Sequence, residues 1–455
     1  MNRKKYQERL LKAIPGGAHT YSRGFDQFPN NAPEILSCGN GAYVHDNKGN
    51  KYLDYGMALR AVNIGYSEKI INKAAINQIK LGNNLTRPSN IELEAAELLI
   101  ELIDSVDMVK FTKNGSTAVS AAVKLARSYT GRDMVARCLQ HPFFSYDDWF
   151  IGSTSVKRGI PKTIQNLTKT FDFNNIESLE KLLKKYPNKF ACVVLEPETD
   201  ITSKNSNTNE NPTETSKFRA TKNFLKNNYL RQVQDLCKKY NVVFILDEMI
   251  TGFRWHLKGA QHLYKLKPDL TTFGKGMANG FSVSCVAGKK EIMQLGSIEK
   301  IGQERTFLLS TTHGAEMCGL GAFVATVKFM KKYSVVDHMW EYGYKLKNII
   351  NNLAYDFKID NNFIVSGPSC SPVYKTYDND KKLSLSLRTL FSQEMINNKI
   401  LMPYITLCYR HQDKELLKTT KSLKKVFPII KKGLNTNMES LIKGNIIKPV
   451  FRKYN

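Results

Sequence analysis

An acid and a lysine each follow a short apolar run in the second half of the chain. Asp247 follows residues 242–246, and Lys275 stands between two glycines directly after Leu270–Phe273. Such a run predicts a strand buried on both faces, and the carboxyl ends of these strands border the ligand crevice of an open α/β sheet. A lysine can form a Schiff base with pyridoxal phosphate while an acid faces the pyridinium nitrogen. The pair therefore indicates a pyridoxal-phosphate site with Lys275 and Asp247 as catalytic residues.

Each of these two signals also has an ordinary structural explanation. An acid after a buried strand is common in α/β proteins, and a Gly-Lys-Gly turn is often only a solvated loop. The flanking glycines would let a flat ligand approach the backbone near Lys275. Met249, two residues beyond Asp247, is then expected to pack against one face of the ligand ring.

A third candidate is the segment Asn114-Gly-Ser-Thr, which lies between a short predicted strand and an alanine-rich helical stretch. Backbone amides at a helix start, together with small hydroxyl side chains, form an anion site. Asn114, Gly115 and Ser116 are therefore candidate phosphate ligands. The same residues could instead serve only to cap the helix.

The motif Asp-Glu-Met-Ile-Thr-Gly-Phe-Arg at 247–254, with the Gly-Lys turn downstream, resembles a motif of class III pyridoxal-phosphate aminotransferases. The likeness is specifically to the branch containing glutamate-1-semialdehyde 2,1-aminomutase, and it runs from about residue 15 to about residue 319. The resemblance implies a fold-type-I α/β enzyme that carries pyridoxal 5'-phosphate. Asn114, Gly115 and Ser116 match the family's Ser-Gly-Thr-Glu-Ala, and Thr117 replaces its glutamate.

The segment from His141 to Trp149 departs from the family. Relatives commonly have Gly-Tyr-His-Gly here, with the tyrosine stacked on the pyridine ring. Phe143 matches that tyrosine and Phe144 matches the histidine. Phenylalanine can still stack, although it lacks the hydroxyl group. A buried aromatic pair without a ligand role is the alternative explanation.

The segment from Arg305 to Glu316 lies where the family has Gly-Thr-Leu-Ser-Gly-Asn-Pro. Thr311 best matches the threonine that reaches the cofactor phosphate of the neighbouring subunit. The resemblance thus implies a homodimer with shared sites. The sequence Thr-His-Gly-Ala-Glu around this threonine differs from the aminomutase, which bears on substrate choice.

Near the N-terminus, residues 14–25 contain Pro15 followed by the paired glycines Gly16 and Gly17 and cannot form long regular structure. This segment is similar to one that lies over the active site of the aminomutase, where an arginine binds a substrate carboxylate. Arg23 matches that arginine, and Thr20 matches a serine of the family. A planar guanidinium suits an anionic substrate group, but a surface arginine in a loop remains an alternative.

The remaining periodicity sets the expected domain organisation. Residues 1–60 are predicted to form an N-terminal segment that joins a small domain, 61–325 a large cofactor domain with a mostly parallel sheet, and 326–455 a small α+β domain. A hairpin is expected at 41–54, helices at 68–81 and 91–103, a strand at 190–196, a mobile loop at 200–221 and a helix at 224–240.

The net charge of +26 raises the possibility of a nucleic-acid partner. Lysines are spread throughout, and the one concentrated stretch, 414–455, has eleven Lys and Arg against two Glu. A solvated face is the simpler explanation, with attraction of anionic substrates second, so no nucleic-acid partner is expected. No apolar run reaches membrane-span length, and the eight cysteines show no CxxC metal pattern. A cytoplasmic enzyme without a metal site is expected.

Two reactions could use the same cofactor-site residues. One is intermolecular transfer of an amino group between a donor, expected to be an amino acid, and an aldehyde or keto acceptor. The other is the intramolecular transfer of the aminomutase. The changes at Phe143, Phe144 and 312–316 favour the intermolecular reaction, with a sugar of surface-polysaccharide synthesis as one candidate acceptor. A basic nucleic-acid-binding protein on a vestigial enzyme fold is the alternative of another class.

Overall fold

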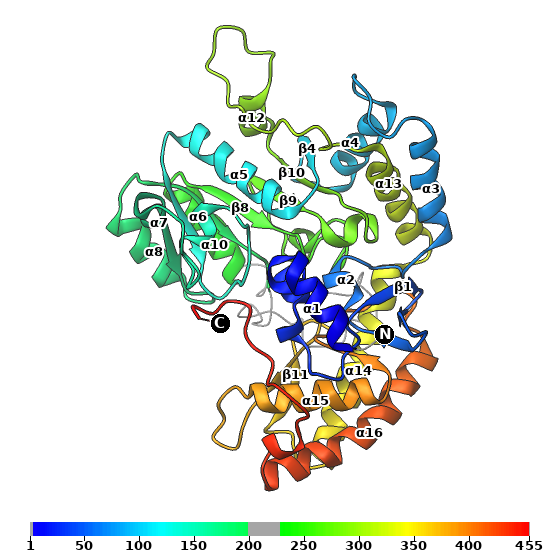
Figure 1. The fold of residues 1–455 in the computed structure, drawn as a ribbon. Helices are drawn as coiled ribbons and strands as arrows, with labels where there is room; N and C mark the ends of the chain where they lie inside the picture. Colours follow the sequence, from blue (N-terminus) through cyan, green and yellow to red (C-terminus); the bar gives the residue numbers. More distant parts are fainter. Residues whose placement is uncertain (1–2, 199–227, 455) are drawn as a thin grey trace. The chain divides into compact units, whose positions relative to one another are not determined.

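The computed structural model describes residues 3–198 and 228–454 and divides into two compact units (Figure 1). One unit comprises Lys69–Val336. The other combines Met1–Glu68 with Asp337–Asn455. The units change after residues 68 and 336, and the boundaries predicted from the sequence lie after residues 60 and 325. The predicted loop at 200–221 and the start of the helix predicted at 224 lie outside the described residues.

The unit Lys69–Val336 is built on a seven-stranded sheet with the order β4-β10-β9-β8-β7-β5-β6. Only β10 runs antiparallel to its neighbours in this sheet, and the other paired strands are parallel. The strands are β4 (Met108–Thr112), β5 (Met134–Cys138), β6 (Thr168–Phe171), β7 (Phe190–Leu195), β8 (Val243–Asp247), β9 (Leu270–Phe273) and β10 (Ser284–Gly288). Every residue of β7, β8 and β9 is buried, as the apolar runs predict.

Helices surround this sheet (Figure 1). They are α3 (Lys69–Lys80), α4 (Asn90–Leu102), α5 (Gly115–Thr130), α6 (Asp148–Ile151), α7 (Lys162–Leu167), α8 (Ile176–Lys185), α10 (Tyr229–Lys239), α11 (Ala260–Tyr264), α12 (Lys290–Met293) and α13 (Met317–Lys332). Helix α5 packs against β7, β9 and β10, while α13 packs against α3 and α4. The helices predicted at 68–81 and 91–103 are confirmed as α3 and α4.

Helix α5 has sequence signals at both ends. Asn114 is the N-cap, and Gly131 ends the helix in the left-handed conformation, with a φ of 65° that glycine adopts without a steric penalty. The face of α5 toward the sheet is rich in small residues, of which Ala118, Ala122 and Ala126 are fully buried. This close packing holds the first turn of α5 in a fixed position beside the sheet.

The other unit contains a small sheet with the order β1-β2-β3-β13 and a separate hairpin, β11-β12. Within the small sheet, β3 and β13 are parallel and the other pairs are antiparallel. The strands are β1 (Leu36–Asn40), β2 (Tyr43–Asp46), β3 (Lys51–Asp54), β11 (Phe363–Ser366), β12 (Val373–Thr376) and β13 (Ile400–Leu401). The hairpin predicted at 41–54 is confirmed as β2-β3.

The helices of this unit are α1 (Arg3–Ala13), α2 (Met57–Arg60), α14 (Val335–Asp356), α15 (Leu385–Asn397) and α16 (Asp413–Asn435). The Pro-Gly-Gly segment forms short 3-10 turns at Pro15–Gly17, Tyr21–Arg23 and Phe25–Gln27. Helix α16 packs on α15. Among the described residues, no helix is long and apolar enough to cross a membrane, and no cluster of metal-binding side chains occurs.

Candidate functional site

Asp247 ends strand β8 and is 2% exposed. Its Oδ1 atom accepts hydrogen bonds from the Met249 amide and from the Thr272 hydroxyl group, both at 2.9 Å. Burial raises the pKa of Asp247 to about 6, although these two hydrogen bonds and the charge of Lys275 act to lower it. Asp247 therefore holds its proton to a higher pH than an exposed aspartate does.

Lys275 follows strand β9, which lies directly beside β8 in the sheet. Parallel pairing sets Asp247 opposite Thr272, three residues before Lys275. Lys275 is partly buried, and its charge acts on Asp247. Its φ of 44° lies in the left-handed region, which is costly for a residue with a side chain and is typical of functional sites. The structure thus brings the two predicted catalytic residues together.

The first turn of α5 supplies a potential anion site. The first amides of a helix have no partner within the helix. Asn114 Oδ1 accepts the Thr117 amide at 2.9 Å, so the Asn114 side chain caps the helix. The amides of Gly115 and Ser116 at the same helix start can bind an anion. The capping explanation and the phosphate-binding explanation therefore apply to different atoms of the same turn.

The Met249 side chain contacts both the first turn of α5 and the turn that carries Lys275. A Cβ atom added at Gly115 would lie 2.8 Å from the Met249 sulfur, and one added at Gly274 would also collide with that sulfur. The Ser284 hydroxyl group contacts the same sulfur atom at 3.8 Å. Glycine at both positions therefore lets Met249 lie between the start of α5 and the turn that carries Lys275.

The aromatic segment after β5 is attached to α5. The Tyr146 amide donates to Ser116 Oγ at 3.2 Å, and Ser145 Oγ lies 3.0 Å from Ser120 Oγ. Phe144 is buried with its ring edge on Phe150, whereas Phe143 is 45% exposed and also contacts the ring of Phe150. Phe144 therefore acts as a packing residue, and Phe143 presents an open ring surface.

Thr311 lies on an exposed loop whose far end is firmly held. The backbone carbonyl and side-chain oxygen of Asn83 accept the Met317 and Cys318 amides at 2.8 and 3.0 Å. Glu316 forms an ion pair with Lys113 and accepts a hydrogen bond from Asn83 Nδ2 at 2.7 Å. The loop is thus anchored beside the strand that leads into the Asn114 turn.

Known proteins match this arrangement over most of the chain. The family profile described as "Aminotransferase class-III" matches residues 29–361. A 3-aminobutyryl-CoA aminotransferase of Cloacimonas acidaminovorans is 30% identical over 432 residues, with 94% of this chain and 97% of that protein covered. The chain belongs to the class III aminotransferases. It is therefore a pyridoxal-phosphate-dependent enzyme.

Other class III relatives carry a different reaction name. A glutamate-1-semialdehyde 2,1-aminomutase of Francisella philomiragia is 30% identical over 371 residues, with 78% of this chain and 79% of that protein covered. Among solved structures, the FumI protein of Sphingopyxis sp. MTA144 superimposes with a TM-score of 0.82 at 21% identity, covering 96% of this chain and 99% of that one. The predicted fold-type-I architecture is confirmed.

The side chains of this aminotransferase suit pyridoxal phosphate. A buried acid of raised pKa beside a lysine fits the ring nitrogen and the aldehyde carbon of the cofactor. Glycine at 115 and 274 lets the Met249 side chain lie beside the turn of Lys275, where it can pack against a flat ring, and the start of α5 suits the phosphate. Asp247, Lys275, Met249 and the turn 114–116 therefore form one candidate cofactor site.

Arg23 and Thr20 belong to the other unit. Both side chains are exposed, and Arg23 ends the 3-10 turn Tyr21–Arg23. Their predicted role in binding substrate therefore stays a prediction.

Two supporting residues had not been predicted from sequence. Thr272 is set beside Asp247 by strand register, which the sequence does not display. Glu248 is fully buried and accepts hydrogen bonds from the Thr251 hydroxyl and from the amides of Ala260 and Gln261, at 2.6 to 2.8 Å. Its position next to Asp247 in the Asp-Glu motif is the feature of the sequence that could have identified it. Its hydrogen bonds hold the backbone of the segment after β8 in place.

Proposed function

We propose that this enzyme is an intermolecular aminotransferase that moves an amino group from a donor to an aldehyde or keto acceptor and releases the keto product of the donor. The observation that carries the proposal is the buried Asp247 beside Lys275 at the carboxyl edge of the sheet. The donor is an amino acid in this proposal, and a sugar of surface-polysaccharide synthesis is one candidate acceptor. Free thiols at all eight cysteines support a reducing, cytoplasmic location.

Bound pyridoxal phosphate supplies an electron sink for negative charge that develops on the substrate carbon. The role of Lys275 is to hold the cofactor before substrate arrives and then to remove a proton from that carbon with its Nζ atom. Asp247 keeps a proton at the ring nitrogen through the negative charge of its buried carboxylate. Thr272 and the Met249 amide orient the carboxylate.

The aromatic segment favours transfer between two molecules over transfer within one. Where relatives have tyrosine and histidine, this chain has Phe143 and Phe144, which provide no hydroxyl or imidazole group. Phe144 is packed in the interior, so it cannot contact a substrate. Relatives named for each of the two reactions are equally identical to this chain, at 30%, so the choice depends on these residues.

The active unit in this proposal is a homodimer in which Thr311 of each chain contacts the phosphate bound by the partner. Several large apolar side chains are exposed on the unit that bears the site, and burial by a second copy would explain them. They are Ile79, Leu81, Leu85, Leu93, Ile301 and Phe307, with exposures from 52% to 97%. Arg23 and Thr20 are proposed to bind an anionic group of the substrate.

Single-turnover assays test the proposed reaction. Purified holoenzyme is mixed with individual amino acids in the absence of any acceptor. We expect at least one donor to convert the cofactor to its amine form and to release one equivalent of keto acid. If glutamate 1-semialdehyde is instead isomerised without release of a keto product, the enzyme is an aminomutase and the proposal is wrong.

A further inference from the structure

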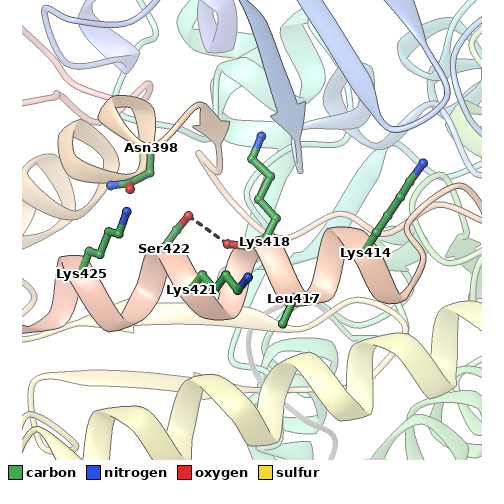
Figure 2. Close-up of a pocket in the computed structure, with 7 residues that line it drawn as sticks. All are labelled: Asn398, Lys414, Leu417, Lys418, Lys421, Ser422 and Lys425. Atoms are coloured by element: carbon green, nitrogen blue, oxygen red, sulfur yellow. Dashed lines mark hydrogen bonds between the residues drawn. The ribbon is translucent and has the colours of Figure 1, made fainter.

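Four lysines of α16 line one pocket of about 380 Å³ in the unit that combines the two ends of the chain (Figure 2). The residues that line the pocket are Asn398, Lys414, Leu417, Lys418, Lys421, Ser422 and Lys425. Lys414, Lys418 and Lys425 extend to the same side of the helix in this view. No acidic side chain is among the lining residues.

The spacing of these lysines gathers positive charge along one face. Positions 414, 418, 421 and 425 follow steps of four, three and four residues, which place side chains in one row on a helix. The row extends about 16 Å at a rise of about 1.5 Å per residue. Like charges at such spacings repel each other and destabilise the helix. An anion bound along the row would remove that repulsion.

The ammonium group of Lys418 lies close to the positive charge of another lysine, Lys51. It lies 5.5 Å from the centre of the Tyr43 ring, and Lys51 lies 4.1 Å from the centre of the same ring. Burial, followed by repulsion from Lys51, lowers the pKa of Lys418. Lys418 Nζ also donates to the Lys399 carbonyl at 3.3 Å. Lys418 is thus held in place at the pocket wall next to further lysines.

The nearest acid does not neutralise this row. The side chain of Glu415 is fully buried, and its carboxylate accepts hydrogen bonds from the Tyr43 hydroxyl at 2.8 Å and from the Gln412 amide at 3.0 Å. It pairs with Lys414 at 3.6 Å and its charge also acts on Lys418, so one carboxylate faces four lysines. Two polar side chains also line the pocket. The Asn398 amide donates one of its hydrogens to the Glu394 carbonyl at 2.9 Å, and the Ser422 hydroxyl donates to the Lys418 carbonyl at 2.9 Å (Figure 2).

We propose that this pocket binds a small molecule that carries a diphosphate group. A compact ligand with several negative charges matches a row of ammonium groups that act as point charges. The volume of about 380 Å³ lies within the range of small-ligand pockets. Nucleic acid is the less suitable occupant, because single strands need aromatic rings for base stacking, and Tyr43, the ring nearest the row, is covered by two lysines.

Calorimetric titration of the holoenzyme with inorganic pyrophosphate tests this inference. The bound cofactor keeps the phosphate site at α5 filled, so binding there does not contribute. We expect saturable binding that Lys421→Gln/Lys425→Gln weakens by about tenfold or more, since two charged contacts are lost. The matched control is Lys424→Gln/Lys431→Gln, which removes the same charge from α16 outside the pocket and should leave the affinity unchanged. Thermal unfolding checks that both variants fold.

The identity of the ligand follows from parallel titrations with coenzyme A and with adenosine diphosphate. Tighter binding of either compound than of pyrophosphate supports the proposal and identifies the source of the diphosphate. Three results would overturn it: no binding of pyrophosphate, equal weakening by the control variant, or tighter binding of a single-stranded oligonucleotide through the same lysines. Aminotransferase activity should be the same in all variants, so this test is independent of the proposed reaction.

Discussion

The strand ends and the loops of the candidate site differ in how they are held. Asp247 is 2% exposed and has its hydrogen-bond partners on β9 and in its own turn. Phe143 is 45% exposed, and Thr311 lies on an exposed loop. The candidate catalytic acid is therefore held by the sheet, whereas Phe143 and Thr311, whose roles are predictions, lie on loops.

This contrast has a physical basis. Burying an acid such as Asp247 costs free energy unless the carboxylate is hydrogen-bonded, so the sheet must supply fixed donors. A residue that binds substrate or a second subunit must instead be reachable from outside. Variants at the strand ends should accordingly affect the rate of reaction most, and variants on the loops should affect binding.

The largest effect is expected for Lys275→Ala. Loss of the proton-transferring amine should reduce turnover by about 10⁴-fold, because no other described side chain next to Asp247 is a lysine. Lys289→Ala is the control, since Lys289 also follows a strand but pairs with Asp269 at 2.6 Å. Steady-state kinetics measure both. A Lys275→Ala enzyme that kept one tenth of its activity would remove this residue from the mechanism.

A smaller effect is expected for Asp247→Asn. The amide cannot stabilise a proton on the ring nitrogen, so turnover should fall by about 10² to 10³-fold while cofactor stays bound. Thr272→Val keeps the charge of Asp247 and removes one hydrogen bond, so its turnover should fall less. Unchanged turnover of the Asp247→Asn enzyme would make Asp247 an ordinary strand-end acid.

The apoenzyme should show the cost of burying Asp247. A carboxyl group whose pKa rises from 3.8 to about 6 on folding stabilises the fold below pH 4, and this contribution is lost as the pH rises through 6. Asp247→Asn should therefore gain stability relative to wild type between pH 4 and pH 8, by roughly 2–3 kcal/mol. Urea unfolding of both apoproteins measures this difference. A difference that does not change with pH would contradict the raised pKa.

The smallest effect is expected on the loop. Thr311→Ala should weaken cofactor binding by about tenfold, the value of one hydrogen bond to a charged group. It should change the rate of the bound enzyme little. Thr312→Ala, which alters the next residue of the same loop, is the control. Equal cofactor affinity in the Thr311→Ala and wild-type proteins would mean that Thr311 does not reach a phosphate.

Heterodimers test whether the sites are shared. Lys275→Ala chains are mixed with Thr311→Ala chains, and cofactor affinity is measured at the site that retains Lys275. If Thr311 acts across the interface, that site receives an intact Thr311 from the Lys275→Ala partner and binds cofactor with wild-type affinity. Weak binding in verified heterodimers would place the role of Thr311 within its own chain.

The sequence was informative where a local pattern decides the structure. Asp247 and Lys275 follow apolar runs, and Asn114 opens a helix, so their elements were predicted correctly. Thr272 was missed because its place beside Asp247 depends on the register of two strands, which the chain does not encode locally. The contact between Lys113 and Glu316 joins residues 203 positions apart, and no local pattern indicates it. Arg23 and Thr311 were identified by resemblance alone, and their roles stay predictions.

The central claim is that Lys275 carries the cofactor opposite Asp247, and covalent trapping tests it most directly. Holoenzyme is reduced with borohydride, digested with trypsin and analysed by mass spectrometry. A cofactor on Lys275 blocks cleavage there, so the predicted result is one modified peptide that spans residues 266–289. The modification should disappear in Lys275→Ala. Cofactor attached to another lysine, or an unmodified 266–275 peptide from saturated enzyme, would contradict the account.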